Sequence, residues 1–340
     1  MQLRRLDTAA GPAVAARHGD GWVPLPAALA LYEAQGQPAL PDLAAASRDV
    51  VAFLGCGAAV REQAATVLEY VAATGADVGQ SADPALLLPF VPRSFRDFML
   101  YERHVIDAGR GMVRRFMPRQ WEALSAYEAA HGEPHPDLRP RPLWYERPIY
   151  YVGNHLSFIP DGATVPWPAY TRALDYELEL GVVIARPIRD AAPDDAAQAI
   201  GGFVVVNDFS ARDVQYPEMT SGFGPVKAKN FATGLGAVVV TADEILPHVE
   251  DLRVEVRVNG AVWGEGRTAG ARYSLGEMVA YASLGEQLHP GELLATGTIP
   301  GCSGLETGQW LSPGDEVELR IERVGALRNV IGAPPAASGR

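Results

Sequence analysis

From about residue 149 the sequence becomes a series of short apolar segments with β-type composition, and this series limits the possible folds most strongly. Only two helices are expected among them, one over 194–200 and one that begins at Ser274, where Ser274 and Glu277 form a capping-box pattern. Asn259-Gly260 between two of the segments predicts a β-hairpin. Many strands with few helices favour a β-rich domain over a doubly wound sheet. The predicted strands span 149–152, 174–184, 203–208, 237–241, 252–258, 293–298 and 316–322.

The first 148 residues have a different pattern and predict two further regions. Residues 1–92 predict a small N-terminal α+β domain, with short strands on either side of a turn at 19–21 and helices near 43–54 and 58–73. Residues 93–148 predict a linking segment that is mainly helical over 96–130, is interrupted near Pro118 and ends in a loop over 131–148. We therefore expect an α+β fold whose larger, β-rich domain spans 149–330.

The composition of the 340-residue chain excludes several classes of function. Its formal net charge of −12 leaves no surplus of cations for nucleic acid or an anionic membrane surface. Cys56 and Cys302 are too few for a disulfide framework, so we expect reduced thiols in a cytoplasmic protein without a secretory signal. No apolar run is long enough to span a membrane. The Gly234-Leu235-Gly236 segment lacks the third glycine and the following helix of a dinucleotide-binding fingerprint.

Residues 174–184 carry three carboxylates at alternate positions of a predicted strand. Side chains alternate along a strand, so Asp175, Glu177 and Glu179 share one face, and neighbours on that face lie roughly 7 Å apart. The strand continues into an apolar run, and carboxylates at the edge of a core repel one another and lose hydration. A hard divalent cation such as Mg²⁺, Mn²⁺ or Ca²⁺ would remove this cost, because it prefers oxygen ligands. The alternative is the solvent-facing acidic side of an edge strand.

A second segment favours the metal site over the exposed strand. Asp208 lies at the exit of a buried-type strand, where a carboxylate is well placed to be a third ligand. Arg212 and Gln215 follow it one helical turn apart and could point the same way. For Asp208 alone, the alternative is a helix N-cap. Together the two segments indicate a site for a divalent metal.

Four segments occur in an order and at spacings that are typical of one enzyme family. They are Asp-Tyr-Glu-Leu-Glu-Leu at 175–180, Asn-Asp-Phe-Ser-Ala-Arg-Asp-Val-Gln at 207–215, Gly-Pro-Val-Lys-Ala-Lys-Asn-Phe at 224–231 and His-Pro-Gly-Glu-Leu-Leu-Ala-Thr-Gly-Thr at 289–298. With them the sequence resembles the fumarylacetoacetate hydrolase family over most of 149–325. The resemblance implies a mixed β-sandwich roll and a homodimer. It also implies Glu177, Glu179 and Asp208 as metal ligands, with Asp175 behind them as a supporting group.

The longer members of this family have an Asp-Phe pair followed by a histidine, and Asp97 with His104 seven positions later matches that spacing. The resemblance implies Asp97 as a further metal ligand, His104 as the catalytic base and Glu306 as the group that orients the histidine. It also implies a catalytic lysine, and Lys229 fits this position better than Lys227. The alternatives are a histidine on a helix surface and two solvated loop lysines.

The resemblance predicts a divalent-metal-dependent hydrolase that cleaves a carbon–carbon bond in a small 1,3-diketo acid, an acylpyruvate or a fumarylacetoacetate-like compound, through a metal-bound enolate. The alternatives are an oxo-acid hydratase, decarboxylase or isomerase on the same scaffold, or a non-catalytic protein that binds an oxo-acid or a metal. Residues 151–155 depart from the family's Tyr-His-Gly-Arg pattern, and Arg114 and Arg115 are only candidates for binding a substrate carboxylate. The expected substrate-binding residues are Arg212, Gln215, Tyr151 and Thr298.

Overall fold

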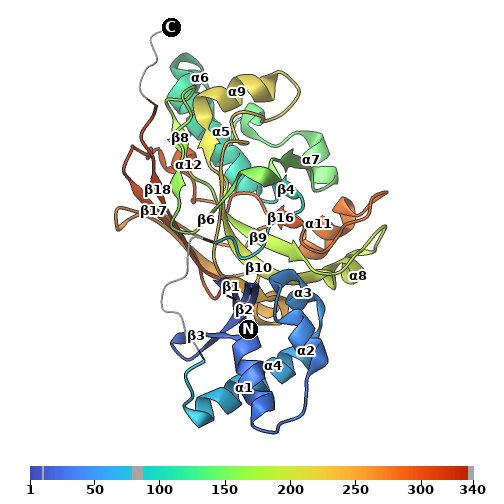
Figure 1. The fold of residues 1–340 in the computed structure, drawn as a ribbon. Helices are drawn as coiled ribbons and strands as arrows, with labels where there is room; N and C mark the ends of the chain where they lie inside the picture. The colour runs from blue at the N-terminus through green and yellow to red at the C-terminus, as the bar shows by residue number, and fades with distance from the viewer. Residues whose placement is uncertain (10, 79–86, 336–340) are drawn as a thin grey trace.

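A central mixed sheet runs through the molecule from the N-terminal residues to the linking segment (Figure 1). The computed structural model describes residues 1–9, 11–78 and 87–335. β12 (Thr233–Leu235) pairs with the central strand β10 and with β6 (Phe158–Pro160). The fold is α+β, as predicted. In spatial order the main path of the sheet is β3 (Gly21–Pro24), β2 (Gly11–His18), β1 (Gln2–Thr8), β13 (Val239–Thr241), β10 (Ile200–Asn207), β9 (Leu178–Ile184), β16 (Leu293–Ala295), β4 (Phe95–Phe98) and β5 (Tyr150–Gly153).

The middle of the central sheet is buried on both faces. Every residue of β9 is buried, and alternate side chains enter different cores, with Val182 in one and Val183 in the other. Phe203 and Val204 of β10 divide in the same way. This double burial explains why both segments are continuous apolar runs in the sequence.

One of the two cores lies between the central sheet and a second sheet of five strands. The predicted hairpin at 259–260 joins two of these strands and is confirmed: Asn259 and Gly260 have φ of 51° and 79°, as a tight two-residue turn requires. β11 (Ser210–Ala211) and β8 (Leu174–Asp175) form a separate small pair. The five strands are, in order, β15 (Ala261–Arg267), β14 (Arg253–Val258), β17 (Glu316–Ile321), β18 (Gly325–Ile331) and β7 (Thr164–Val165).

The other core is covered by the N-terminal helices. The first of them was not predicted from the sequence, and it begins without a side-chain N-cap. The helix predicted over 43–54 is two helices, since Asp49 begins the second by accepting a hydrogen bond from the Ala52 amide. β1 pairs with β13, so residues 1–92 share the central sheet with the later region, and the domain boundaries at 92 and 148 stay a prediction. The helices are α1 (Leu25–Ala34), α2 (Pro41–Ala46), α3 (Val50–Gly55) and α4 (Ala58–Thr74).

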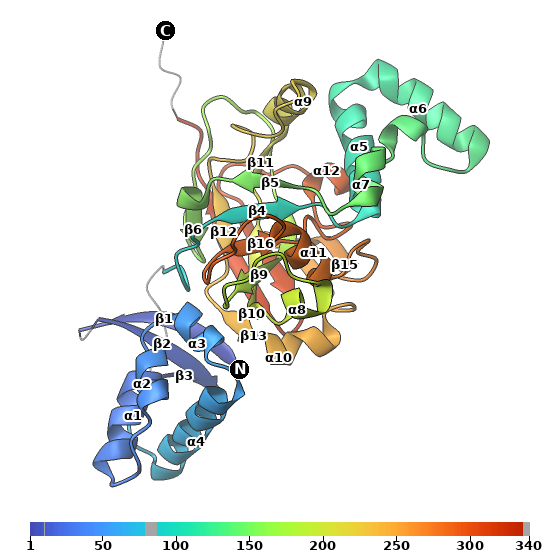
Figure 2. The ribbon, with the colours of Figure 1, turned by 90° about the vertical axis from the view of Figure 1, so that its right-hand side faces the viewer.

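The linking segment begins with a strand, so the helix predicted from residue 96 was wrong at its start. β4 is buried throughout and pairs in parallel with β16, and four residues are too few to show a strand pattern. α5 (Glu102–Phe116) and α6 (Pro118–His131) follow, and the predicted interruption lies between them. The predicted loop over 131–148 contains η1 (Pro136–Leu138) and α7 (Pro142–Glu146), which each start at a proline. α6 extends away from the sheets (Figure 2).

The segment predicted as one strand over 174–184 is divided into β8 and β9. Between them the Leu178 amide donates to the Cys302 carbonyl, and Glu177 pairs with Ser303 in an isolated bridge. The predicted capping box at Ser274 is confirmed. None of the helices in the described ranges is both long and apolar enough to cross a bilayer. The remaining helices are η2 (His155–Ser157), α8 (Pro193–Ala197), α9 (Arg212–Thr220), α10 (Ala242–Ile245), η3 (Leu246–His248), α11 (Leu275–Ala282) and α12 (Gly304–Thr307).

Candidate active site and metal centre

Three carboxylates meet where strands of the central sheet end. Asp97 lies on β4, Glu179 on β9, and Asp208 directly after β10. One oxygen atom from each of them lies within 4.8 Å of the others, and all three side chains are buried. The Asp208 amide donates to the Glu177 carbonyl at 3.1 Å, which fixes the exit of β10 beside the acidic segment. The sheet therefore gathers residues that are 29 or more positions apart in the sequence into one acidic group.

The surroundings of this group fit a divalent cation. Asp97 Oδ1, Glu179 Oε2 and Asp208 Oδ1 are buried and have no hydrogen-bond partner among the described residues. Burial raises the pKa of all three carboxyl groups, and the pKa of Asp97 and Glu179 is raised further by the neighbouring carboxylates. Buried oxygen atoms without partners are costly, and a hard cation such as Mg²⁺, Mn²⁺ or Ca²⁺ would satisfy them.

The second oxygen of two of these carboxylates is held by the protein. Asp208 Oδ2 accepts hydrogen bonds from the Tyr151 hydroxyl at 2.7 Å and from Lys229 Nζ at 2.6 Å. Thr298 Oγ1 donates to Glu179 Oε1 at 3.4 Å. Tyr151 and Thr298, predicted to bind substrate, therefore contact the acidic group itself. Each contact orients a carboxylate and leaves its other oxygen for a ligand.

Glu177 has different surroundings from these three. Its Oε1 accepts from Arg212 Nη2 at 2.6 Å, and its Oε2 accepts from Lys229 Nζ. Burial by itself raises the pKa of Glu177, but the two cations outweigh it and hold the pKa below its ordinary value. Glu177 lies outside the group of three, and its predicted role as a direct ligand stays a prediction.

The two buried cations are both paired with buried carboxylates. Burial alone would lower the pKa of Lys229, but Asp208 and Glu177 raise it, so the lysine stays charged. Arg212 Nε donates to Asp175 Oδ2 at 2.8 Å, and its Nη1 donates to the Gln215 side-chain oxygen at 2.8 Å. Arg212 and Gln215, both predicted to bind substrate, therefore bind each other. The side-chain nitrogen of Gln215 remains available as a donor.

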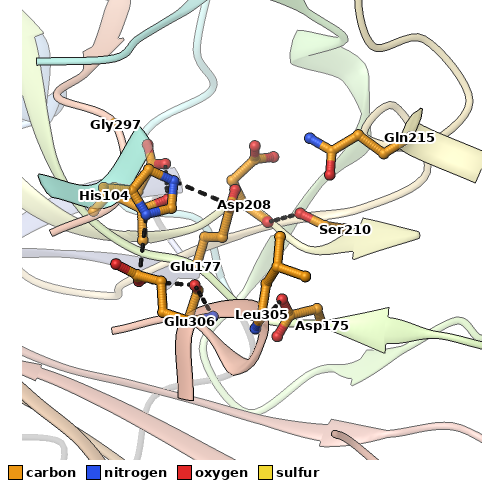
Figure 3. A network of polar contacts seen from close by, with 12 residues as sticks. His104, Asp175, Glu177, Asp208, Ser210, Gln215, Gly297, Leu305 and Glu306 are labelled. Carbon is orange, nitrogen blue, oxygen red and sulfur yellow. Dashed lines mark hydrogen bonds and ion pairs between the residues drawn. The ribbon is translucent and has the colours of Figure 1, made fainter. Parts of the chain in front are cut away.

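His104 lies on α5 between two acidic side chains (Figure 3). Its Nδ1 is 3.3 Å from Glu306 Oε2, and its Nε2 is 3.8 Å from Glu177 Oε1. Glu306 is held in turn by the Gly301 amide at 3.1 Å and by Ser303 Oγ at 2.8 Å. The contact between the histidine and Glu306 has the length of an ion pair, without the alignment of a hydrogen bond. A carboxylate on Nδ1 leaves Nε2 facing the cavity, which is the arrangement of a general base.

Close approaches at two glycines place α12 against α5 and against Asp175 of β8. A Cβ atom on Gly111 of α5 would lie 1.9 Å from the Leu305 carbonyl oxygen of α12. A Cβ atom on Gly304 would lie 2.4 Å from Asp175 Oδ1, which accepts the Gly304 amide at 2.8 Å. The bare backbone at these positions allows the approach that places Glu306 against His104.

Several residues that support the site were not predicted from the sequence. Asn207 Oδ1 accepts the Glu177 amide at 3.0 Å, and its place directly before Asp208 could have pointed to it. Ser303 caps α12 and holds Glu306, in the serine-x-x-glutamate pattern that also marks α11. Arg114 and Arg115 do not line the cavity, and Arg115 instead lies over the Trp310 ring. Lys227 is exposed and bonds Glu218 through its backbone, outside the site.

One cavity of about 460 Å³ opens onto the site, and His104 lines it. Asp97, Glu177 and Glu179 line its buried part, together with Arg212 and Lys229. We call the more exposed part the apolar wall. It consists of residues from α5, from α9 and from the connection that follows β4: Met99, Val105, Ala108, Met112, Tyr216 and Met219.

Comparison with known proteins agrees with the sequence motifs. The sequence profile described as fumarylacetoacetate (FAA) hydrolase C-terminal matches residues 121–332. The chain belongs to the fumarylacetoacetate hydrolase family. Asp97 and His104 precede the matched residues, so their place in the site rests on the structure.

Solved structures with the same fold cover most of the chain, and a relative found by sequence covers about half of it. A mitochondrial oxaloacetate tautomerase from Pongo abelii is 31% identical over 188 residues, which are 55% of this chain and 82% of the relative. The fumarylacetoacetate hydrolase of Exiguobacterium antarcticum matches with a TM-score of 0.64 and 20% identity, covering 98% of this chain and 99% of that one. A 5-carboxymethyl-2-hydroxymuconate delta-isomerase from Mycobacterium smegmatis matches with a TM-score of 0.60 and 21% identity, covering 98% of each chain. Proteins named as a hydrolase and as an isomerase therefore share this fold.

Proposed function

We propose that this protein is a divalent-metal-dependent hydrolase that cleaves a carbon–carbon bond in a small 1,3-diketo acid. The proposal rests on one observation: His104, backed by Glu306, lines the same cavity as Asp97 and Glu179 of the acidic group that fits a cation. Asp97, Glu179 and Asp208 would hold Mg²⁺ or Mn²⁺, with Glu177 as a further candidate ligand. When bound, the ion supplies Lewis-acid polarisation of the substrate's oxygen atoms.

His104 is the proposed general base. Its Nε2 would take a proton from water, and the resulting hydroxide would add to the acyl carbonyl carbon of the substrate. The carbon–carbon bond then breaks, its electron pair moves to the oxo-acid half, and His104 returns the proton to that carbon. Glu306 would stabilise the imidazolium in between. A positioned base of this kind contributes typically about 10²–10⁴-fold to the rate.

Lys229 and Gln215 are the donors proposed to bind the anion that develops on the oxo-acid half. Lys229 Nζ has three hydrogens, of which the protein uses two on Glu177 and Asp208. The Gln215 amide nitrogen borders the same cavity. Each preorganised donor of this kind is typically worth about 3–4 kcal/mol of transition-state stabilisation.

An isomerase or tautomerase is the second candidate function. The observation that favours it is the naming of relatives as an oxaloacetate tautomerase and as isomerases. His104 could move a proton between two carbon or oxygen positions of an oxo-acid without using water. Both candidates need the same base and the same ion, so the products distinguish them.

The test follows an acylpyruvate by its ultraviolet absorbance with added Mg²⁺ or Mn²⁺, and identifies the products by NMR. Hydrolysis predicts pyruvate and a free carboxylic acid in equal amounts, with loss of activity on adding a chelator. His104→Ala should lower the rate by about 10²–10⁴-fold while calorimetry finds the Mn²⁺ affinity unchanged. Proton exchange with no cleavage would replace the hydrolase by the isomerase.

A further inference from the structure

The apolar wall of the cavity is built from the faces of two helices. On α5, the side chains at 105, 108 and 112 follow the spacing of one helical face just beyond His104. On α9, Tyr216 and Met219 lie beyond Gln215. The two helices lie against each other, so both faces border the same space. A substrate whose oxo-acid end reaches the acidic group would extend its other end along this wall.

The cations of the cavity are already neutralised by the protein. Among the described residues that line it, the permanently charged cations are Arg212 and Lys229, and both bind buried carboxylates. Five buried carboxylates, those of Asp97, Asp175, Glu177, Glu179 and Asp208, face these two cations. A divalent ion adds two positive charges and still leaves the group with one net negative charge, so the described lining holds no unpaired permanent cation for a carboxylate at the far end of the substrate.

We propose that the distal end of the substrate is uncharged and apolar, an alkyl or aryl acyl group. This inference rests on the proposed function and names the substrate class within it: acylpyruvates rather than dicarboxylates. A carboxylate placed against the wall would lose hydration with no cation to replace it. An alkyl chain would instead be buried against three methionines, whose flexible side chains adapt to different chain shapes.

The first test compares substrates of matched length. Pentanoylpyruvate and succinylpyruvate have distal ends of similar size, and only the second carries a distal charge. We expect pentanoylpyruvate to have a kcat/KM at least tenfold higher. Within the series acetyl-, propanoyl- and butanoylpyruvate, kcat/KM should rise about fourfold per added CH₂, which corresponds to ~0.8 kcal/mol of apolar burial. Equal or better turnover of succinylpyruvate would overturn the inference.

A binding measurement separates this inference from the proposed function. Calorimetry on His104→Ala loaded with Mg²⁺ measures the affinity for both compounds without turnover. If the enzyme isomerises acylpyruvates instead of cleaving them, the proposed hydrolysis fails, but tighter binding of pentanoylpyruvate still supports an apolar distal end. If cleavage occurs and succinylpyruvate binds as tightly, the apolar distal end fails alone.

A variant pair tests the wall directly. Met219 is partly exposed, so Met219→Lys adds a cation to the wall without burying it. It should raise kcat/KM for succinylpyruvate relative to pentanoylpyruvate by at least tenfold. Met219→Gln, which is polar and uncharged, is the matched control and should leave that ratio within about twofold of the wild-type value. An unchanged ratio in Met219→Lys, in a variant with wild-type thermal stability, would contradict the placement of the distal group at the wall.

Discussion

Two groups of carboxylates lie at the same site and have opposite surroundings. In the open group, Asp97, Glu179 and Asp208 each have a buried oxygen atom with no partner in the described chain. In the paired group, both carboxylates of Asp175 and Glu177 bind Arg212, and Glu177 also binds Lys229. The acidic residues at positions 175, 177 and 179 therefore have different partners, although they form one regular pattern in the sequence. Asp208 also binds Lys229, but only through its Oδ2, whereas cations occupy both oxygen atoms of Glu177. Whether one oxygen atom is left without a partner, and not the acidic pattern, decides which carboxylates remain available for a ligand.

The paired group also connects the two halves of the site. Asp175 accepts the amides of Gly304 and Leu305 at 2.8 and 2.9 Å, and these begin the helix that carries Glu306. The same carboxylate binds Arg212, which binds Glu177. The histidine half is therefore tied to the metal half through buried charges. We therefore expect the paired group to contribute to folding and the open group to ligand binding.

The largest expected effect on folding comes from the paired group. Glu177→Ala leaves Arg212 and Lys229 with one buried partner fewer, and removing one member of a buried ion pair costs about 3–5 kcal/mol. Urea unfolding of the metal-free protein should show this loss in the free energy of unfolding. A loss below about 1 kcal/mol would mean that Glu177 belongs with the open group.

A substitution in the open group should weaken metal binding without lowering the stability of the metal-free protein. Glu179→Gln removes one of the charges that would hold the ion; two unit charges about 4 Å apart interact by ~4 kcal/mol at an effective dielectric constant of about 20, and a divalent ion should lose at least that much. Mn²⁺ affinity should therefore fall on the order of 10³-fold by calorimetry. The metal-free variant should be at least as stable as the wild type, because a repulsive buried charge is gone. Loss of stability without loss of metal affinity would reverse the assignment of the two groups.

The sequence predicted the acidic ligand segment better than the geometry around it. Alternation along a strand and the exit of the next strand marked Asp175, Glu177, Glu179 and Asp208 as candidates, and the family resemblance chose among them. Asp97 was found only through a family spacing, because its strand has four residues and was predicted as a helix. The contact of His104 with Glu306 spans 202 positions and depends on the close approach of α5 and α12, which no local pattern encodes. The separation of open from paired carboxylates likewise depends on where Arg212 and Lys229 reach in three dimensions.

The two groups should also give stability opposite dependences on pH. An acid whose pKa is raised on folding adds stability below its unfolded pKa and loses it as pH rises towards the folded value. Burial raises the pKa of the open group in this way, so the metal-free protein should lose stability as pH rises above about 4, by up to ~1.4 kcal/mol per pH unit for each proton released. Glu177, whose pKa is lowered, adds stability above about 4.3 that is lost as pH falls.

Urea unfolding between pH 5 and pH 8, with a chelator and then with excess Mg²⁺, measures this difference. The ion should remove most of the decline, because it replaces the protons on the open group. Glu179→Gln in the presence of chelator should show a shallower decline than the wild type, since one of the titrating groups is gone. Identical pH profiles with chelator and with Mg²⁺ would exclude the open group as the binding site.

The smallest effect is expected from the connection between the two halves. Asp175→Asn keeps the size of the side chain but replaces one acceptor oxygen with a donor, which weakens its contacts with Arg212 and with the start of α12. Glu306 should then hold His104 less firmly, and kcat should fall about tenfold, as is typical when a supporting group is changed. Mn²⁺ affinity should stay within about threefold of the wild type, because the open group is intact. A fall in metal affinity as large as the fall in kcat would show that Asp175 acts on the ligands directly rather than through the helix that carries Glu306.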